Sequence, residues 1–402
     1  MLSNRISLGL AAFLLVVTAG MRAYGQDHEL AGAALGEPAD IRPYDNWAEP
    51  KQGLFFTFDG LYWHISPPAK TSIGDPTYNP TVYFLQNENG AAVINSFPEA
   101  NSLDTSATSV WKWGDRMELG YIDGHQGFMF TSLLTQSQTS ETSAANAFVV
   151  FNDPPLPITQ PVTGLSYLDT YMGLNTAGQP IYERTPVDFR TVYVQNKSRL
   201  AGIEALYLYR MTELALGGQL EFTAGGRYFE LKDQFWVDAR GGNLTDSYWN
   251  TTSHNEIGGP EIGARYYQPY GRFGISAEGR FTAGINSQSV LQTGIIGSGL
   301  VAGQNAYPQP TLLSSTTFSN STHWVEFSPI VELRVEAHMQ LTNMIALKAG
   351  YTGLFVNNTV RAADMVNYEL SNTTTMGITR ALNGNLQPMY AQGLNLSIEF
   401  NR

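Results

Sequence analysis

The stretch PIVELRVEAHMQ, residues 329–340, alternates between two kinds of side chain from Val331 onward. Every odd position from Val331 to Met339 is apolar, and the positions between them carry Glu332, Arg334, Glu336 and His338. A helix turns by about 100° per residue and would scatter the apolar positions around its circumference. A strand turns successive side chains to opposite faces and separates the two sets. The stretch is therefore predicted to be a β-strand with one apolar face and one charged face.

The same alternation returns along the chain in segments of about ten residues, with no segment of helical period between them. This pattern predicts an all-β protein. The predicted strands are roughly 54–65, 115–123, 127–137, 199–211, 217–231, 256–268, 271–285, 324–340, 344–356 and 389–400.

The connections between these segments are alternately short and long. Short turns rich in Gly, Pro, Asn and Asp lie at 123–126, 212–216, 269–271 and 341–343. The long connections are 66–114, 138–198, 232–255, 286–323 and 357–388. Short periplasmic turns and long extracellular loops are typical of an outer-membrane barrel. A soluble β-sandwich has no reason to segregate its loops in this way. Residues 53–402 are therefore predicted to form a transmembrane antiparallel up-and-down β-barrel of about ten strands, with twelve as the alternative count.

The two faces of such strands would touch lipid and lumen. The apolar faces use Ala and Gly as often as large residues, which suits contact with lipid. A lumen enclosed by ten strands is narrow, and charges of both signs on neighbouring strands would pair across it. The predicted lumen-facing residues are Glu118, Glu204, Glu221, Arg227, Glu261, Arg265, Glu278, Arg280, Glu332, Arg334, Glu336, His338, Lys348 and Glu399.

Composition agrees with a membrane barrel. Charged residues are only 14% of the 402 residues, against about 25% in soluble domains. The formal net charge of −12 argues against nucleic acid as a partner. The chain has no cysteine, so it has neither disulfides nor thiolate metal sites.

The N-terminus has the pattern of a secretory signal. Arg5 precedes an apolar run, and small residues precede a cleavage position before Gln26, so residues 1–25 are predicted to be a signal peptide. The alternative is a retained anchor helix, for which the run is short. Residues 26–52 are acidic and Pro-rich without a period and are predicted to be a flexible periplasmic lead-in. The predicted location is the cell outer membrane.

Several stretches together resemble a known family. They are FFTFDGLYWHI (55–65), GGRYFELKDQF (225–235) and ELRVEAHMQLTNMIALKAGYTGLFVNNTVRAADMVN (332–367). They are similar to the beta-barrel porins of type seven, which are abundant in planctomycetes. The resemblance implies an outer-membrane barrel, with outer-membrane lipid and the barrel-assembly machinery as partners. Arg361 and Asp364 match the family's Arg and Asp after the ninth strand, and an ion pair that orders this loop is expected between them. In EFNR, Phe400 lies two residues from the end, unlike the usual terminal aromatic residue.

Two functions of different class follow from this reading. The first is a narrow porin-like channel for small solutes. The second is a structural or adhesive barrel with a plugged lumen and functional surface loops, and a secreted β-sandwich is a third and lesser alternative. The six His are scattered and no HExxH or GxSxG motif occurs, so neither an enzyme nor a metal site nor a cofactor is expected.

Overall fold

The computed structural model describes most of the chain beyond its N-terminal segment. The described residues are 53–69, 73, 82–88, 91–97, 110–149, 169–174, 180–184, 187–212, 214, 217–242, 244–304, 314–368, 376–379 and 386–401. The predicted signal peptide (1–25) and lead-in (26–52) lie outside them. Within the described part, no helix is both long enough and apolar enough to cross a membrane.

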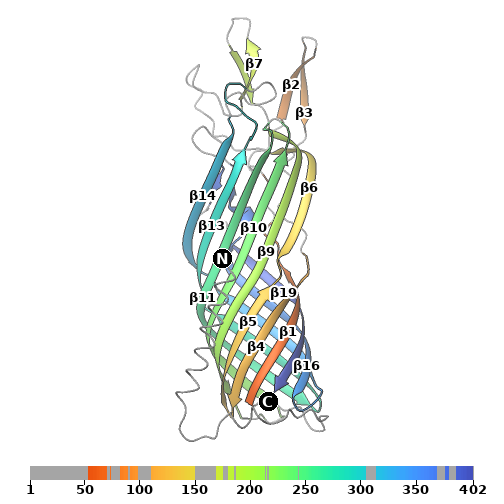
Figure 1. Cartoon of the computed structure of the whole chain (residues 1–402), viewed down its shortest axis with the longest axis vertical. Coiled ribbons are helices and arrows are strands. Elements are labelled where there is room, and N and C mark those ends of the chain that lie inside the picture. The colour runs from red at the N-terminus through yellow and green to blue at the C-terminus, as the bar shows by residue number, and fades with distance from the viewer. Residues whose placement is uncertain are drawn as a thin grey trace.

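Ten strands form a closed antiparallel barrel (Figure 1), and the predicted fold class and strand number are confirmed. Around the ring the order is β10-β9-β5-β4-β1-β19-β16-β15-β12-β11, and pairing of β11 with β10 completes it. The first strand, β1, pairs with the last, β19. The barrel strands are β1 (Gly53–Ile65), β4 (Lys112–Asp123), β5 (Gln126–Thr135), β9 (Val187–Arg210), β10 (Gln219–Arg240), β11 (Ser247–Tyr270), β12 (Phe273–Thr282), β15 (Ile330–Gln340), β16 (Ile345–Val360) and β19 (Leu386–Asn401).

Tight turns join β4 to β5, β11 to β12 and β15 to β16, as the sequence predicted, and β9 is followed by its antiparallel neighbour β10 after residues 211–218, which the structure describes in part. Gly124 and Gly271 occupy two of these turns with φ of +57° and +62°. A side chain is disfavoured in this left-handed region, so glycine is the residue that allows the chain to reverse there. By the general rule for such barrels, this end faces the periplasm.

Six of the ten strands continue beyond the barrel at the opposite end, which Figure 1 shows at the top. Strands β9, β10 and β11 do so as single strands of 24, 22 and 24 residues. After two-residue interruptions, β5 continues into β6 (Gln138–Val149) and β12 into β13 (Ile285–Ile296), while β14 (Thr316–Phe327) leads down into β15. The result is a six-stranded extension in the order β6-β9-β10-β11-β13-β14.

The extension corrects the sequence-based boundaries. Residues 138–198, 232–255 and 286–323 were expected to be long loops, but much of each segment is strand. At about 3.3 Å per residue, a 24-residue strand is about 80 Å long. A tilted membrane strand needs only about 9–11 residues. The outer halves of these strands therefore lie beyond the bilayer, where outward side chains need not be apolar, and the alternation fades.

The remaining described elements are short. They are the hairpins β2 (Val82–Glu88) with β3 (Ala91–Phe97), β7 (Asp169–Leu174) with β8 (Pro180–Arg184), and β17 (Val366–Asn367) with β18 (Gly377–Ile378), and the 3₁₀ helix η1 (Ala362–Met365). Figure 1 shows β2, β3 and β7 at the end of the molecule that carries the extension.

Residues 330–340 form β15, and the two faces of this strand are separated as predicted. Leu333 and Val335 are 62% and 55% exposed on the outer wall. Glu332 and Arg334, between and beside them, are 2% exposed inside the barrel. A shift of one residue in register would exchange these two sets.

Candidate functional site in the barrel lumen

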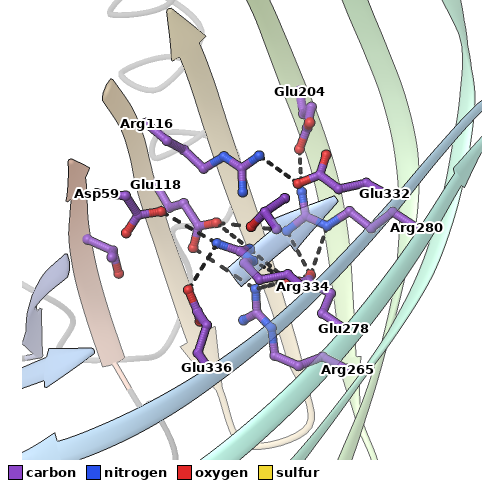
Figure 2. A network of polar contacts seen from close by, with 12 residues as sticks. Asp59, Arg116, Glu118, Glu204, Arg265, Glu278, Arg280, Glu332, Arg334 and Glu336 are labelled. Carbon is purple, nitrogen blue, oxygen red and sulfur yellow. Dashed lines mark hydrogen bonds and ion pairs between the residues drawn. The ribbon is translucent and has the colours of Figure 1, made fainter. Parts of the chain in front are cut away.

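The lumen holds a network of charged side chains, and Figure 2 shows its central part. They come from β1, β4, β9, β10, β11, β12, β15, β16 and β19, because every second residue of each strand points inward. The carboxylates outnumber the basic groups. The acidic members are Asp59, Glu118, Glu204, Glu221, Glu261, Glu278, Glu332, Glu336 and Glu399, and the basic members are Arg116, Arg210, Arg227, Arg265, Arg280, Arg334 and Lys348.

Arg334 lies at the centre of the network (Figure 2). Its Nη2 donates to Glu278 Oε2 at 2.6 Å and to Glu118 Oε1 at 2.7 Å. Its Nη1 lies 3.5 Å from Asp59 Oδ2 and 3.7 Å from Glu336 Oε1. One guanidinium therefore joins carboxylates from β1, β4, β12 and β15, and so crosses the lumen.

Glu332 plays the reciprocal role for the basic groups. Its Oε1 accepts from Arg116 Nη2 at 2.5 Å, and its Oε2 accepts from Arg227 Nη2 at 2.7 Å. Arg227 also approaches Glu204 at 3.2 Å, and Glu204 in turn forms a short ion pair with Arg280. Strands on opposite sides of the barrel are linked by this chain of ion pairs.

The network extends toward the periplasmic end through more local pairs. Arg210 donates to Glu221 through Nη2 at 2.7 Å and Nε at 2.9 Å. Lys348 Nζ lies 2.5 Å from Glu399 Oε2. His338 shares a hydrogen bond of 2.8 Å with the hydroxyl of Ser276.

A second level, mainly apolar, lies directly above the charges, and the indole N–H of its Trp63 donates to Asn395 Oδ1 at 3.1 Å. Its members are buried to 4% exposure or less, and two of them cover guanidinium groups. The Cζ of Arg116 lies 5.7 Å from the ring centre of Trp63, and that of Arg227 lies 5.7 Å from the ring centre of Phe229. These are cation–π distances. The apolar level consists of Leu61, Trp63, Ile65, Leu133, Leu200, Phe229, Leu231, Ile257, Ile330, Leu354, Val356, Met389 and Ala391.

A third level is made by the chain itself where it leaves β16. We call residues 357–368 the mouth segment. The side-chain amide of Asn255 pairs with Val360 as a neighbouring strand would, accepting from its N–H at 2.8 Å and donating to its carbonyl at 2.9 Å. Gln288 donates to the carbonyl of Asn358 at 2.7 Å. Asn358 itself has φ of 54°, a region that Asn tolerates better than most residues. Polar side chains of β11 and β13 thus hold the mouth segment over the lumen.

Arg361 anchors the same segment to β10, which corrects a prediction. The expected partner was Asp364, but Arg361 Nε pairs with Asp233, and Nη2 donates to the carbonyl of Ser66 at 3.0 Å. Asp364 lies one turn further on in η1, where burial raises the pKa of its carboxyl. Spacing along the chain suggested a local pair, whereas the turn of η1 sends the two side chains to different neighbours.

An apolar cap packs on the mouth segment inside the extension. It combines inward residues of the extension with Ala362, Ala363 and Tyr368 of the mouth segment and with Met376. The strand residues of the cap are Phe189, Val192, Val194, Phe235, Val237, Ala239, Trp249, Ile296 and Phe318. Charge network, apolar level, mouth segment and cap follow one another along the barrel axis.

The structure places all fourteen predicted lumen residues on the inner face, where most of them join the network; His338 and Arg265 are its more exposed members. The sequence-based list omitted Asp59, Arg116 and Arg210. The signal for them was present, since Arg116 is two residues before Glu118 and has the same inward parity. No group of three or more His, Cys, Asp or Glu in the described part of the chain could hold a metal ion.

Three solved structures illustrate the distant matches to this chain. The outer membrane protease OmpT from Escherichia coli is 10% identical, with a TM-score of 0.38, over 91% of this chain and 99% of that one. A FadL homologue of Pseudomonas aeruginosa is 8% identical, with a TM-score of 0.23, over 87% and 90%. The toluene transporter TbuX of Ralstonia pickettii is 8% identical, with a TM-score of 0.15, over 87% and 89%. These likenesses are too distant to bear on what this chain binds.

A comparison with curated proteins gave no match. The family comparison did: the model described as "Putative beta barrel porin-7 (BBP7)" matches residues 85–401. That range includes nine of the ten barrel strands, the mouth segment and most of the charged network. The resemblance stated from the sequence is thereby confirmed, and the chain belongs to the beta barrel porin-7 family.

Proposed function

We propose that this protein is an outer-membrane barrel with a closed lumen, whose working surface is the extension and the loops outside the cell. The observation that carries the proposal is the packing of the lumen at the height of the charges. Asp59 and Glu118 are 0% exposed, and Arg116 and Glu261 are 1% exposed. Side chains that line a water-filled pore would be wetted along its length.

Opening a path through this region would be costly. A solute would have to separate Arg334 and Glu332 from their partners, and breaking a buried pair by removing one partner costs about 3–5 kcal/mol. It would then have to cross the apolar level and displace the mouth segment. Ten strands leave little room, since eight-stranded barrels are filled by side chains and open aqueous channels are found at about sixteen.

The alternative is a narrow channel for small solutes, which the family's description as porins supports. It requires a second state in which the mouth segment and the ion pairs have moved aside. The same family description is the reason that we propose no catalysed reaction. Residence in the cell outer membrane, insertion by the barrel-assembly machinery and contact with outer-membrane lipid are part of the proposal for either function.

Planar-bilayer recording separates the two functions. Purified protein is reconstituted, and folding is verified by faster gel migration before boiling than after. Folded protein that produces no steady current steps supports the closed barrel. Reproducible single-channel steps from the same preparation would replace it with the channel. Recovery from cells in the soluble periplasmic fraction without detergent would remove the membrane location itself.

A further inference from the structure

The outer wall of β9, β10, β11, β13 and β14 changes chemistry in layers from the barrel upward. Residues that face each other across an antiparallel sheet share a face, and the next row on that face lies two residues along. One such row is Ile203, Tyr228, Gly258, Ile285 and Phe327, in register from strand to strand. Its four large side chains are 41–61% exposed, which marks an apolar wall.

Charged side chains follow above this wall. Glu230 and Glu256 face each other in the next row. Arg199, Lys232 and His254 then form a row of three basic residues on adjacent strands. His254 lies 3.7 Å from Glu230, and Arg199 and Lys232 also attract the Glu230 carboxylate electrostatically, although neither forms a direct ion pair with a described residue.

Neutral polar and aromatic residues take over two rows higher. Trp236 lies between Gln195 on β9 and Asn250 on β11. Its ring meets the ring of Tyr193 edge-on, with centres 5.6 Å apart. Asn250 accepts from Gln234 Nε2 at 3.0 Å. Glu141 on β6 continues this row and accepts from Gln195 Nε2 at 2.7 Å, and Lys197 lies opposite Gln234 in the row below. This part of the wall therefore offers ring edges, amides and a few charged groups.

We propose that this wall binds a glycolipid of the surrounding outer leaflet, one that carries a phosphate on a neutral sugar. The inference rests on the proposed outer-membrane location. The physical basis is that the same strands carry both the wall that contacts acyl chains and the rows above it. A molecule that covers those upper rows would therefore be the head group of a lipid in the same leaflet. Hydrocarbon would then meet the apolar rows, phosphate the basic row that lies above Glu230 and Glu256, and sugar the amide–aromatic rows.

Each row supplies the chemistry that its layer needs. Arg199 and Lys232 are point charges for a phosphate close to the hydrocarbon boundary, where each basic residue near an anionic lipid surface contributes about 1 kcal/mol. Trp236 and Tyr193 give an apolar surface for a sugar ring, and Asn250 and Gln195 give donors and acceptors for its hydroxyls. Glu230 attracts both basic residues, so a lipid phosphate would share Arg199 and Lys232 with that carboxylate.

The test measures lipid retained by the folded barrel, with native mass spectrometry in detergent. Three probes are used: an acylated glucosamine-disaccharide phosphate, the same lipid without phosphate, and phosphatidylglycerol, which has phosphate but no glucosamine. The wild-type protein is expected to bind the first about tenfold more tightly than either of the others. Lys232→Gln and Arg199→Gln should each weaken binding of the phosphorylated glycolipid about fivefold and not affect the dephosphorylated one.

Trp236→Ala should weaken both glycolipids about tenfold and leave phosphatidylglycerol unchanged. If Trp236→Ala does not fold, Asn250→Ala tests the same contact in the same direction. Arg272→Gln and Tyr270→Ala, exposed residues at the opposite end of the barrel, are the matched controls and should bind as the wild type does.

Equal retention of all three lipids by the wild type would overturn the proposal, as would unchanged binding by the Arg199, Lys232 and Trp236 variants. Equal binding of phosphatidylglycerol and the phosphorylated glycolipid would also overturn the proposal, because the sugar would then contribute nothing to recognition. If the wild-type protein does not enter bilayers at all, the proposed function itself is refuted. That outcome is recognised separately, by the loss of heat-dependent gel migration.

Discussion

Replacing Arg334 with methionine removes the cation that four carboxylates share. Two of them, on Glu278 and Glu118, lie at 2.6 and 2.7 Å, and two, on Asp59 and Glu336, at 3.5 and 3.7 Å. With an effective dielectric constant of about 20, one opposite charge about 4 Å away contributes about 4 kcal/mol before desolvation is counted. Methionine keeps most of the volume, so the cavity term is small.

The expected loss for Arg334→Met is about 3–5 kcal/mol of unfolding free energy, because buried carboxylates remain without their partner. Glu278 keeps Arg265 and Arg280, so the loss falls mainly on Asp59 and Glu336. The matched variant is Asp59→Asn, which removes one carboxylate from a network that has an excess of them. It should change stability by less than about 1 kcal/mol.

The assay is urea unfolding of the protein in lipid vesicles, followed by tryptophan fluorescence and by heat-dependent gel migration. A loss below about 1 kcal/mol for folded Arg334→Met would refute the reasoning. It would mean that water screens these charges, as it does for exposed ion pairs, and that the lumen is wet.

Asp233→Asn should detach the mouth segment, because Asp233 is the ion-pair partner of Arg361. Limited proteolysis should then cut within residues 357–368 while the barrel stays folded. An unchanged digest would contradict the anchoring role of this ion pair. Leu333→Cys should react with an apolar thiol reagent and not with a membrane-impermeant charged one, since its side chain is 62% exposed on the lipid-facing wall; labelling by the charged reagent would reverse the assigned faces. Burial raises the pKa of the Asp364 carboxyl, so its ionised form destabilises the protein once the pH rises above the ordinary pKa of an aspartate. Asp364→Asn should therefore be more stable than wild type at neutral pH. The difference should be absent at low pH, in melting curves recorded at both pH values.

Alternation of side chains was sufficient to predict the barrel, its tight turns and the inward parity of the charges. It works because a bilayer makes the outer face apolar wherever the strand crosses it. Arg116 has the same parity as Glu118, so its omission from the candidates was avoidable. An up-and-down barrel closes by pairing its first strand with its last, as β1 and β19 do.

The extension and the mouth segment could not be predicted from the alternation of side chains. Outside the bilayer the outward residues of β10 and β11, such as Gln234 and Asn250, are as polar as a loop, so the period of two disappears. The partner of Arg361 is 128 residues away in the chain, and Asn255 pairs with Val360 across 105 residues. Such contacts depend on which strands the barrel brings together, and a single sequence does not contain that information locally.

Thr131 offers the most direct measurement of whether the lumen is closed. Its side chain is 5% exposed, faces inward from β5 beside Glu204 and Glu118 in register, and has a hydroxyl without a hydrogen-bond partner. Thr131→Cys is therefore nearly isosteric and breaks no hydrogen bond. The closed barrel predicts that this cysteine resists a small charged thiol reagent while folded in vesicles and reacts fully after unfolding. Rapid labelling of the folded protein, with its gel migration unchanged, would show a water-filled lumen and contradict the account.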